Sequence, residues 1–301
     1  MLTEKELSAS LQKVVKAPIR VGNLADLHID QEKFLAFFQP FFEELEDDTY
    51  LIRQNQLEFL LEQLPQEQLN LQKLHPQYFA GHLSQEALTP YINQLSPNQQ
   101  AKLEQLSKVT RQRSLAIFEL TWQEDQFQIT PIEDTKFQQK VEDFREWERV
   151  FAPTDPKAIG STWFTDFLRA TAKMVKQIHP ECTQLKMTAH FMRTLAYENI
   201  AGENAPEGIH EDGTPYIISA LVINRKNALG GESSIYEQVN QQQKELLYKK
   251  ALAAGEFIFQ ADTGEEHIFG NDLWHHVSAI FPEDVQQVAT RDIIGLDIDW
   301  S

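Results

Sequence analysis

The chain has 301 residues, of which 42% are hydrophobic, 10% aromatic and 24% charged, the composition of an ordinary globular protein. Its formal net charge of −18 and the absence of a basic cluster in the sequence argue against nucleic acid and anionic membranes as partners. The sequence contains no apolar run of the roughly 20 residues that a membrane-spanning helix needs. It also lacks a secretory signal pattern, and its single cysteine, Cys182, favours a reducing compartment, so we expect a cytoplasmic protein.

The first 108 residues are predicted to be helical. From Phe34 to Leu45 the apolar residues recur with the period of an amphipathic helix. Proline disfavours a helix interior, so Pro40 is expected to split this helix. A stretch rich in glutamine and leucine follows, and we expect it to be divided into short helices at Pro65, Pro76, Pro90 and Pro97. We therefore predict a helical N-terminal region, residues 1–108, that packs on a domain formed by residues 109–301.

The second part of the chain is predicted to consist mainly of strands. Two strands, 114–122 and 126–130, flank a turn, and helices are expected over 136–151 and 162–178. Short strands then dominate, with one helix expected at 240–253. These strands are predicted at 189–196, 216–224, 233–236, 256–260, 272–280 and 293–298. Many short strands with few helices between them indicate a sandwich or a jelly roll.

A metal site is predicted in this strand-rich part. His210 and Asp212 form an H-x-D pair, and side chains two residues apart in an extended segment point the same way. A further imidazole comes from the pair His275-His276. Two histidines and one carboxylate make the facial triad of non-haem iron oxygenases, which leaves coordination positions open for a co-substrate and oxygen. Adjacent strand residues face opposite sides, so only one of these two histidines can bind, and the alternation of their neighbours does not decide between them.

Arg291 follows the tandem histidines by 16 residues when counted from His275, near the start of the last predicted strand. A planar guanidinium binds a carboxylate through two hydrogen bonds, which an ammonium cannot do. We interpret Arg291 as the anchor for the distal carboxylate of 2-oxoglutarate. The alternative is a surface arginine that pairs with Asp292. His190 is interpreted as a core or pocket-lining residue.

Several segments carry a resemblance to a known family. They are 208–213, 221–225, 230–233, 275–278 and 291–293, and they resemble the bacterial 2-oxoglutarate–iron dioxygenases typified by L-isoleucine dioxygenase. The resemblance covers roughly residues 111 to 300. It implies a double-stranded β-helix (jelly-roll) core, a requirement for Fe(II), 2-oxoglutarate and O2, and hydroxylation of a small molecule, a free L-amino acid.

The resemblance also implies roles for individual residues. His210 and Asp212 match the H-x-D ligands, and the family pattern selects His275 rather than His276 as the third ligand. Arg291 matches the arginine that binds the co-substrate. Arg193 matches an arginine on the strand before the H-x-D pair, and we expect it to bind a carboxylate of the substrate.

The same motifs are also compatible with other functions. A cupin-type metalloenzyme, such as an isomerase, could use the same fold and ligands without 2-oxoglutarate, but it would have no use for Arg291 as an anchor. The same fold could also serve as a non-catalytic binding module or as a protein-hydroxylating oxygenase. The oligomeric state is left open between a monomer and a homodimer.

Overall fold

The computed structural model describes residues 18–138, 147–240, 243–263 and 273–300. The chain divides into two compact units. The first comprises Met1–Glu46 and Arg113–Ser301, and the second comprises Asp47–Gln112. The predicted metal ligands all belong to the first unit.

The first unit is built on a large antiparallel sheet. Its strand order is β1-β12-β8-β15-β7-β3, and β4 pairs with the outer side of β3. The strands are β1 (Ile19–Asn23), β3 (Arg111–Gln123), β4 (Gln126–Ile132), β7 (Gln184–Ala196), β8 (Tyr216–Lys226), β12 (Glu256–Ala261) and β15 (Ala289–Trp300). The long central strand β15 pairs with β7 along its whole length and with β8 on its other side.

Helices cover one face of this sheet. They are η2 (Leu24–Leu27), α2 (Gln31–Phe38), η3 (Gln39–Glu44), α7 (Pro156–Ile159) and α8 (Thr162–Ile178), the last as predicted. Asp30 and Ser161 cap α2 and α8 by accepting backbone N–H groups of their first turns. Phe38 and Phe164 bury their rings against Phe191 of β7, with ring centroids 6.1 and 5.6 Å apart. Because side chains alternate along a strand, His190 and the other β7 residues of its parity face away from the helices.

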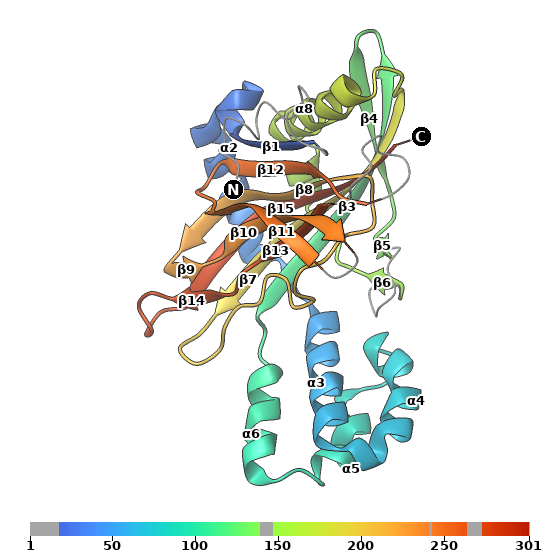
Figure 1. The fold of residues 1–301 in the computed structure, drawn as a ribbon, viewed down its shortest axis with the longest axis vertical. Helices are drawn as coiled ribbons and strands as arrows, with labels where there is room; N and C mark the ends of the chain where they lie inside the picture. The colour runs from blue at the N-terminus through green and yellow to red at the C-terminus, as the bar shows by residue number, and fades with distance from the viewer. Residues whose placement is uncertain (1–17, 139–146, 241–242, 264–272, 301) are drawn as a thin grey trace. The chain divides into compact units, whose positions relative to one another are not determined.

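A small sheet lies over that other face. Its strand order is β11-β10-β13, formed by β11 (Gln243–Ala251), β10 (Glu232–Asn240) and β13 (Leu273–Val277). Figure 1 shows the layers, with α2 and α8 on one side of the large sheet and β10 and β13 on the other. A shorter pair, β9 (Ala228–Gly230) and β14 (Ile280–Pro282), continues the barrel. The predicted mainly-β jelly roll with helical additions is confirmed.

One predicted helix is wrong, and the described ends of another form strands. The segment 240–253 contains all of β11, which pairs antiparallel with β10, and its Tyr248 is buried. Pairing with a neighbouring strand has overridden the helical propensity of this polar segment. The described ends of the segment 136–151 form the short strands β5 (Lys136–Phe137) and β6 (Arg149–Val150), which pair with each other. Residues 139–146 lie outside the described residues.

Residues 18–46, predicted as part of the helical N-terminal region, belong to the first unit, where Ile19–Asn23 forms the strand β1. The second unit is helical, as predicted for that part of the chain. Its helices are α3 (Thr49–Gln63), η4 (Pro65–Glu67), α4 (Gln68–Phe79), η5 (Gln85–Leu88), α5 (Thr89–Ile92) and α6 (Pro97–Leu106). Leucines form its core, among them Leu57, Leu60 and Leu71. The expected break at Pro76 is wrong: α4 continues to Phe79, and its last turn is held by the buried side chains of Tyr78 and Phe79.

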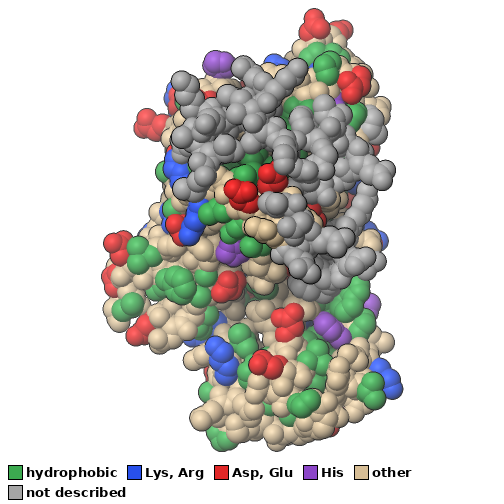
Figure 2. Space-filling view, viewed as in Figure 1, with side chains coloured by type: hydrophobic (Ala, Val, Ile, Leu, Met, Phe, Trp, Pro, Cys, Tyr) green, Lys and Arg blue, Asp and Glu red, His purple; other side chains and the backbone are tan. Residues whose placement is uncertain are grey.

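The surface carries dispersed charges. On the face shown in Figure 2, the described lysines and arginines are scattered among acidic and apolar side chains. Among the described residues, none of the helices has the length and apolar character required to cross a membrane.

Candidate metal centre

Two short extended segments bring the predicted ligands together. The backbone N–H of His210 donates to the carbonyl of His275, and the N–H of His275 donates to the carbonyl of His210, both at 2.9 Å. This antiparallel bridge ties the loop after β7 to β13 and sets the two imidazoles side by side, with ring centroids 4.2 Å apart. Asp212, two residues after His210, directs its carboxylate to the same point, as the H-x-D spacing predicts.

The side-chain atoms of these residues converge. Nε2 of His275 lies 3.3 Å from Oδ2 of Asp212, and Nε2 of His210 lies 3.8 Å from Oδ1. Ligand atoms of His210, Asp212 and His275 all lie within 4.8 Å of one another, close enough to share one metal ion. Two imidazole nitrogens and one carboxylate oxygen suit Fe(II). The donor set therefore fits a facial triad.

The protonation of the two histidines differs. Burial lowers the pKa of His210, and the neighbouring His275 lowers it further. Burial also lowers the pKa of His275, but the carboxylates of Asp212 and Asp262 outweigh that effect and raise it to about 10. In the metal-free protein the cluster therefore holds a proton on His275, which a metal ion has to displace.

The choice between the tandem histidines follows from the strand. In β13 the side chains of Leu273, His275 and Val277 are buried, while Trp274 and His276 alternate with them and are half-buried. His275 points to Asp212, and His276 faces the other side. The pairing of β13 with β10 thus determines which of the two histidines faces the site, a question that strand alternation alone left open.

Asp262 is a part of this site that the sequence did not suggest. It follows β12 directly, its side chain is fully buried, and its Oδ2 accepts the backbone N–H groups of Asp212 and Gly213, both at 2.8 Å. Its Oδ1 lies 3.6 Å from Nδ1 of His275. On His210, Nδ1 lies 3.0 Å from the carbonyl of Gly208 and donates to it. These contacts orient both rings so that Nε2 of each faces the cluster.

Arg291 lies inside the barrel with only 1% of its surface exposed. It does not pair with Asp292, so the alternative of a surface ion pair is wrong. Nη1 donates to Asn204 at 3.2 Å, while Nε and Nη2 have no hydrogen-bond partner among the described residues. Burial and the neighbouring Arg225 lower its pKa to about 9, so the guanidinium is still cationic at neutral pH.

The backbone leaves room for this arginine at Gly231. A Cβ at that position would lie 3.1 Å from Cδ of Arg291 and 2.9 Å from Nη1 of Arg225, and Gly231 has a φ of +65°. Both the space and the backbone conformation require glycine. The Gly230-Gly231 pair therefore makes room for a buried cation.

Arg193 lies neither beside the metal centre nor beside Arg291. It shares the helix-covered face of β7 with Phe191, and its guanidinium donates to Asp292 at 2.7 and 2.9 Å and to Glu43 at 2.7 and 2.9 Å. Burial lowers the pKa of Arg193, but the two carboxylates outweigh it and raise the value. Its donors are thus occupied by side chains of the first unit, away from the barrel interior where Arg291 lies.

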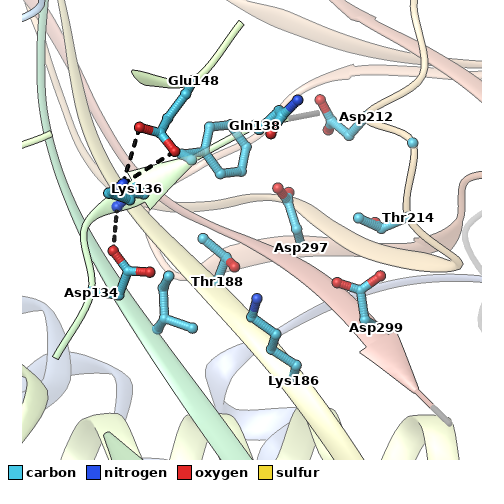
Figure 3. A pocket seen from close by; sticks show the side chains of 13 residues that line it. Asp134, Lys136, Gln138, Glu148, Lys186, Thr188, Asp212, Thr214, Asp297 and Asp299 are labelled. Atoms are coloured by element: carbon cyan, nitrogen blue, oxygen red, sulfur yellow. Dashed lines mark hydrogen bonds and ion pairs between the residues drawn. The ribbon is translucent and has the colours of Figure 1, made fainter. Parts of the chain in front are cut away.

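A cavity of about 280 Å³ adjoins the metal centre, with Asp212 on its wall. Asp297 of β15 points into it (Figure 3), and this residue was also missed by sequence reasoning. Asp297 has the same strand parity as Arg291, so alternation along β15 is the signal that could have found it. Burial raises the pKa of Asp297 and Asp212 raises it further; together they outweigh the lowering by Arg113 and hold the pKa well above its ordinary value.

Comparisons with known proteins agree with this architecture. The family model described as 2OG-Fe dioxygenase matches residues 89–297. A solved BsmA homologue from Methylobium petroleophilum PM1 is similar with a TM-score of 0.62 and 17% identity, covering 97% of this chain and 92% of that one. IDO from Bacillus thuringiensis is similar with a TM-score of 0.60 and 14% identity, covering 100% of this chain and 97% of that one. No curated protein matches the sequence significantly. At these identities the two solved structures support the fold.

Proposed function

The chain belongs to the 2OG-Fe dioxygenase family, and from this premise we propose that it hydroxylates a free L-amino acid. It is a 2-oxoglutarate-dependent non-haem iron dioxygenase, and its family uses Fe(II), 2-oxoglutarate and O2. The substrate assignment rests on the resemblance of its motifs to enzymes typified by L-isoleucine dioxygenase. The small cavity beside Asp212 supports a small-molecule substrate.

His210, Asp212 and His275 are the proposed Fe(II) ligands. Their converging donor atoms support this assignment, and the remaining positions on the metal are left to co-substrate and oxygen. Bound iron would supply, with 2-oxoglutarate and O2, the oxidising power for hydroxylation of a C–H bond; one oxygen atom would enter the substrate and the other the succinate formed with loss of carbon dioxide. The protein orients the reactants and keeps water out. Asp262 and the Gly208 carbonyl hold the ligands at their positions.

The observation that supports the use of 2-oxoglutarate is the buried guanidinium of Arg291, which has no carboxylate partner among the described residues. A cation without a carboxylate partner in a protein interior is costly, and it gains most from an incoming anion. The distal carboxylate of 2-oxoglutarate, held by two parallel hydrogen bonds from Nε and Nη2, would supply that anion. Arg291 then fixes one end of the co-substrate while the metal holds the other.

The competing functions are less well supported. A cupin-type enzyme that does not use 2-oxoglutarate would leave Arg291 buried without a function, and the family match disfavours it. A non-catalytic module would have no need for three converging ligands and a supporting carboxylate such as Asp262.

A screen of free amino acids tests the proposal. The protein is incubated with Fe(II), ascorbate and 2-oxoglutarate in air, and succinate is measured with each of the protein L-amino acids in turn. We expect one amino acid or a related group to stimulate succinate formation and to gain one oxygen atom. The Asp212→Ala variant serves as the control for background oxidation. Succinate formation that no amino acid stimulates would contradict the substrate class and leave the dioxygenase assignment standing.

A further inference from the structure

The cavity beside the metal centre is separated from the proposed co-substrate anchor. Arg291 and Asp297 lie on the same face of β15, six residues apart, which corresponds to roughly 20 Å along a strand. Arg291 lies beside Gly231 at one end of the barrel, and Asp297 points into the cavity that Asp212 lines at the other. A molecule in this cavity would therefore reach the metal without competing for Arg291.

The carboxylate of Asp297 is held in place by a chain of hydrogen bonds. Nη2 of Arg113 lies 2.7 Å from Nδ1 of His190, and Nε2 of His190 lies 3.1 Å from Oδ2 of Asp297. An arginine only donates, so Nδ1 of His190 accepts and Nε2 carries the proton that is donated to Asp297. Phe137 and Phe151 flank the Arg113 guanidinium at 5.2 and 4.3 Å and fix the start of the chain.

This arrangement gives the cavity a carboxyl group in a fixed orientation. Asp297 is only 7% exposed, yet its carboxylate lies at the centre of the cavity wall (Figure 3). Its hydrogen-bond donor, His190, is neutral in the tautomer that Arg113 imposes, so the direct contact orients the carboxyl group and places no positive charge on His190. A buried carboxylate oriented in this way suits a cationic ligand group.

A cationic group lies at the edge of the same cavity. Lys186 projects from β7, two residues before Thr188, and its ammonium group lines the cavity on the Thr188 side of Asp297 (Figure 3). In the part of the chain that the structure describes, Lys186 makes no ion pair. Lys136, the other lysine of the cavity, is occupied by Glu148 at 3.2 Å. Several carboxyl groups line the cavity, and Asp297 is the one that His190 holds in place. Lys186 is the ammonium that makes no ion pair among the described residues.

We propose that this cavity is the substrate site, in which Asp297 binds the ammonium group and Lys186 the carboxylate of an α-amino acid. The inference rests on the proposed function and deepens it. Both charges of a small zwitterion are matched, and the side chain of the amino acid extends along the wall towards Asp212. Specificity against 2-hydroxy acids follows, because a hydroxyl group brings no charge to the Asp297 carboxylate.

The test measures binding beside the metal without turnover. The protein is loaded with Mn²⁺ and 2-oxoglutarate without iron, and paramagnetic relaxation of ligand protons is recorded for each protein L-amino acid. Each amino acid that binds is compared with its 2-hydroxy acid and with its decarboxylated amine. We expect at least one amino acid to be relaxed by the metal and its 2-hydroxy acid to bind about tenfold or more weakly. If the metal relaxes no amino acid, the proposal is overturned.

Two variants separate the two charges. Asp297→Asn should weaken amino-acid binding about ten- to a hundredfold and leave the 2-hydroxy acid unchanged. Lys186→Met should weaken binding of the amino acid and leave binding of the decarboxylated amine unchanged. Asp166→Asn, which makes the same charge change on the exposed surface of α8, is the matched control and should bind like the wild type.

A check on folding accompanies both variants. Mn²⁺ affinity equal to that of the wild type shows that a variant is folded, and if Asp297→Asn fails this check, Lys186→Met on the exposed end of β7 decides. Unchanged amino-acid binding in a folded Asp297→Asn or Lys186→Met variant overturns the proposal. Succinate formation stimulated by a compound without an ammonium group, and by no amino acid, would overturn it as well, while leaving the dioxygenase function intact.

Discussion

Oδ1 of Asp262 lies 3.6 Å from Nδ1 of His275, on the side of the ring opposite the Nε2 that faces Asp212. The other oxygen of the same carboxylate accepts the backbone N–H groups of Asp212 and Gly213. One fully buried side chain thus supports two of the three proposed ligands, which come from segments far apart in the sequence. The metal centre depends on this carboxylate as well as on the residues that touch the metal.

Replacing Asp262 should therefore loosen the site. In Asp262→Asn the amide keeps one acceptor but loses the charge that faces His275, and we expect Mn²⁺ affinity to fall about ten- to a hundredfold. The affinity is measured by titration with detection of free Mn²⁺. Asp284→Asn, an exposed substitution outside the site, is the control. An unchanged affinity in Asp262→Asn would show that this carboxylate only closes a turn.

The tandem histidines should respond differently to substitution. His275→Ala removes a proposed ligand, so we expect metal binding and turnover to be lost. His276→Ala removes a half-buried side chain on the opposite face of β13 and should retain most of both. Metal titration and succinate formation are measured for the two variants side by side. Loss of metal binding in His276→Ala alone would reverse the assignment.

Arg291 should determine the affinity for 2-oxoglutarate. Arg291→Lys keeps the charge but loses the paired hydrogen bonds, which contribute about 1.5–3 kcal/mol. We expect the KM for 2-oxoglutarate to rise about ten- to a hundredfold, and further in Arg291→Ala. Metal affinity should hardly change. Arg169→Lys on α8 is the matched control, and an unchanged KM in both Arg291 variants would make Arg291 a structural residue.

Metal binding should strengthen as the pH rises. Burial lowers the pKa of His275, but Asp212 and Asp262 raise it to about 10, so between pH 6 and 8 the metal must displace a proton. Mn²⁺ affinity should increase about tenfold for each pH unit in this range. The stability of the metal-free protein should depend on pH in the opposite direction. The protonated imidazole of His275 stabilises the fold fully below pH 6.5, and this contribution is lost as the pH rises towards 10.

The measurement is a Mn²⁺ titration at several pH values, with thermal unfolding of the metal-free protein alongside. His276→Ala is the control, because its imidazole does not face Asp212, and it should keep the slope. A Mn²⁺ affinity independent of pH would show that His275 is already neutral before the metal binds.

Much of the site could be predicted from local sequence because strand geometry is local. The H-x-D spacing of His210 and Asp212 directs both side chains to one side. The alternation of apolar residues located most strands. Strand alternation alone could not choose between His275 and His276, and only the family resemblance selected His275. The pairing of β13 with β10, a contact between segments about 40 residues apart, determines which of the two faces the site.

Other features depend on long-range contacts that no local pattern reveals. Asp262 lies 50 residues after Asp212, and only the folded barrel brings them together. Arg193 has the sequence environment of a pocket residue, but strand alternation turns it to the helix layer and to Glu43. The strand β11 has a helical composition, and its partner β10 determines its conformation.

The central claim, a metal centre of His210, Asp212 and His275 that consumes 2-oxoglutarate, is tested most directly by Asp212→Ala. Fe(II) binding and the conversion of 2-oxoglutarate to succinate are measured for the wild type and this variant, with thermal unfolding as the check on folding. We predict that the wild type forms succinate only when Fe(II) is present. The variant should unfold within a few degrees of the wild type, bind Fe(II) weakly and form no succinate. A folded Asp212→Ala protein that forms succinate at the wild-type rate would contradict the account.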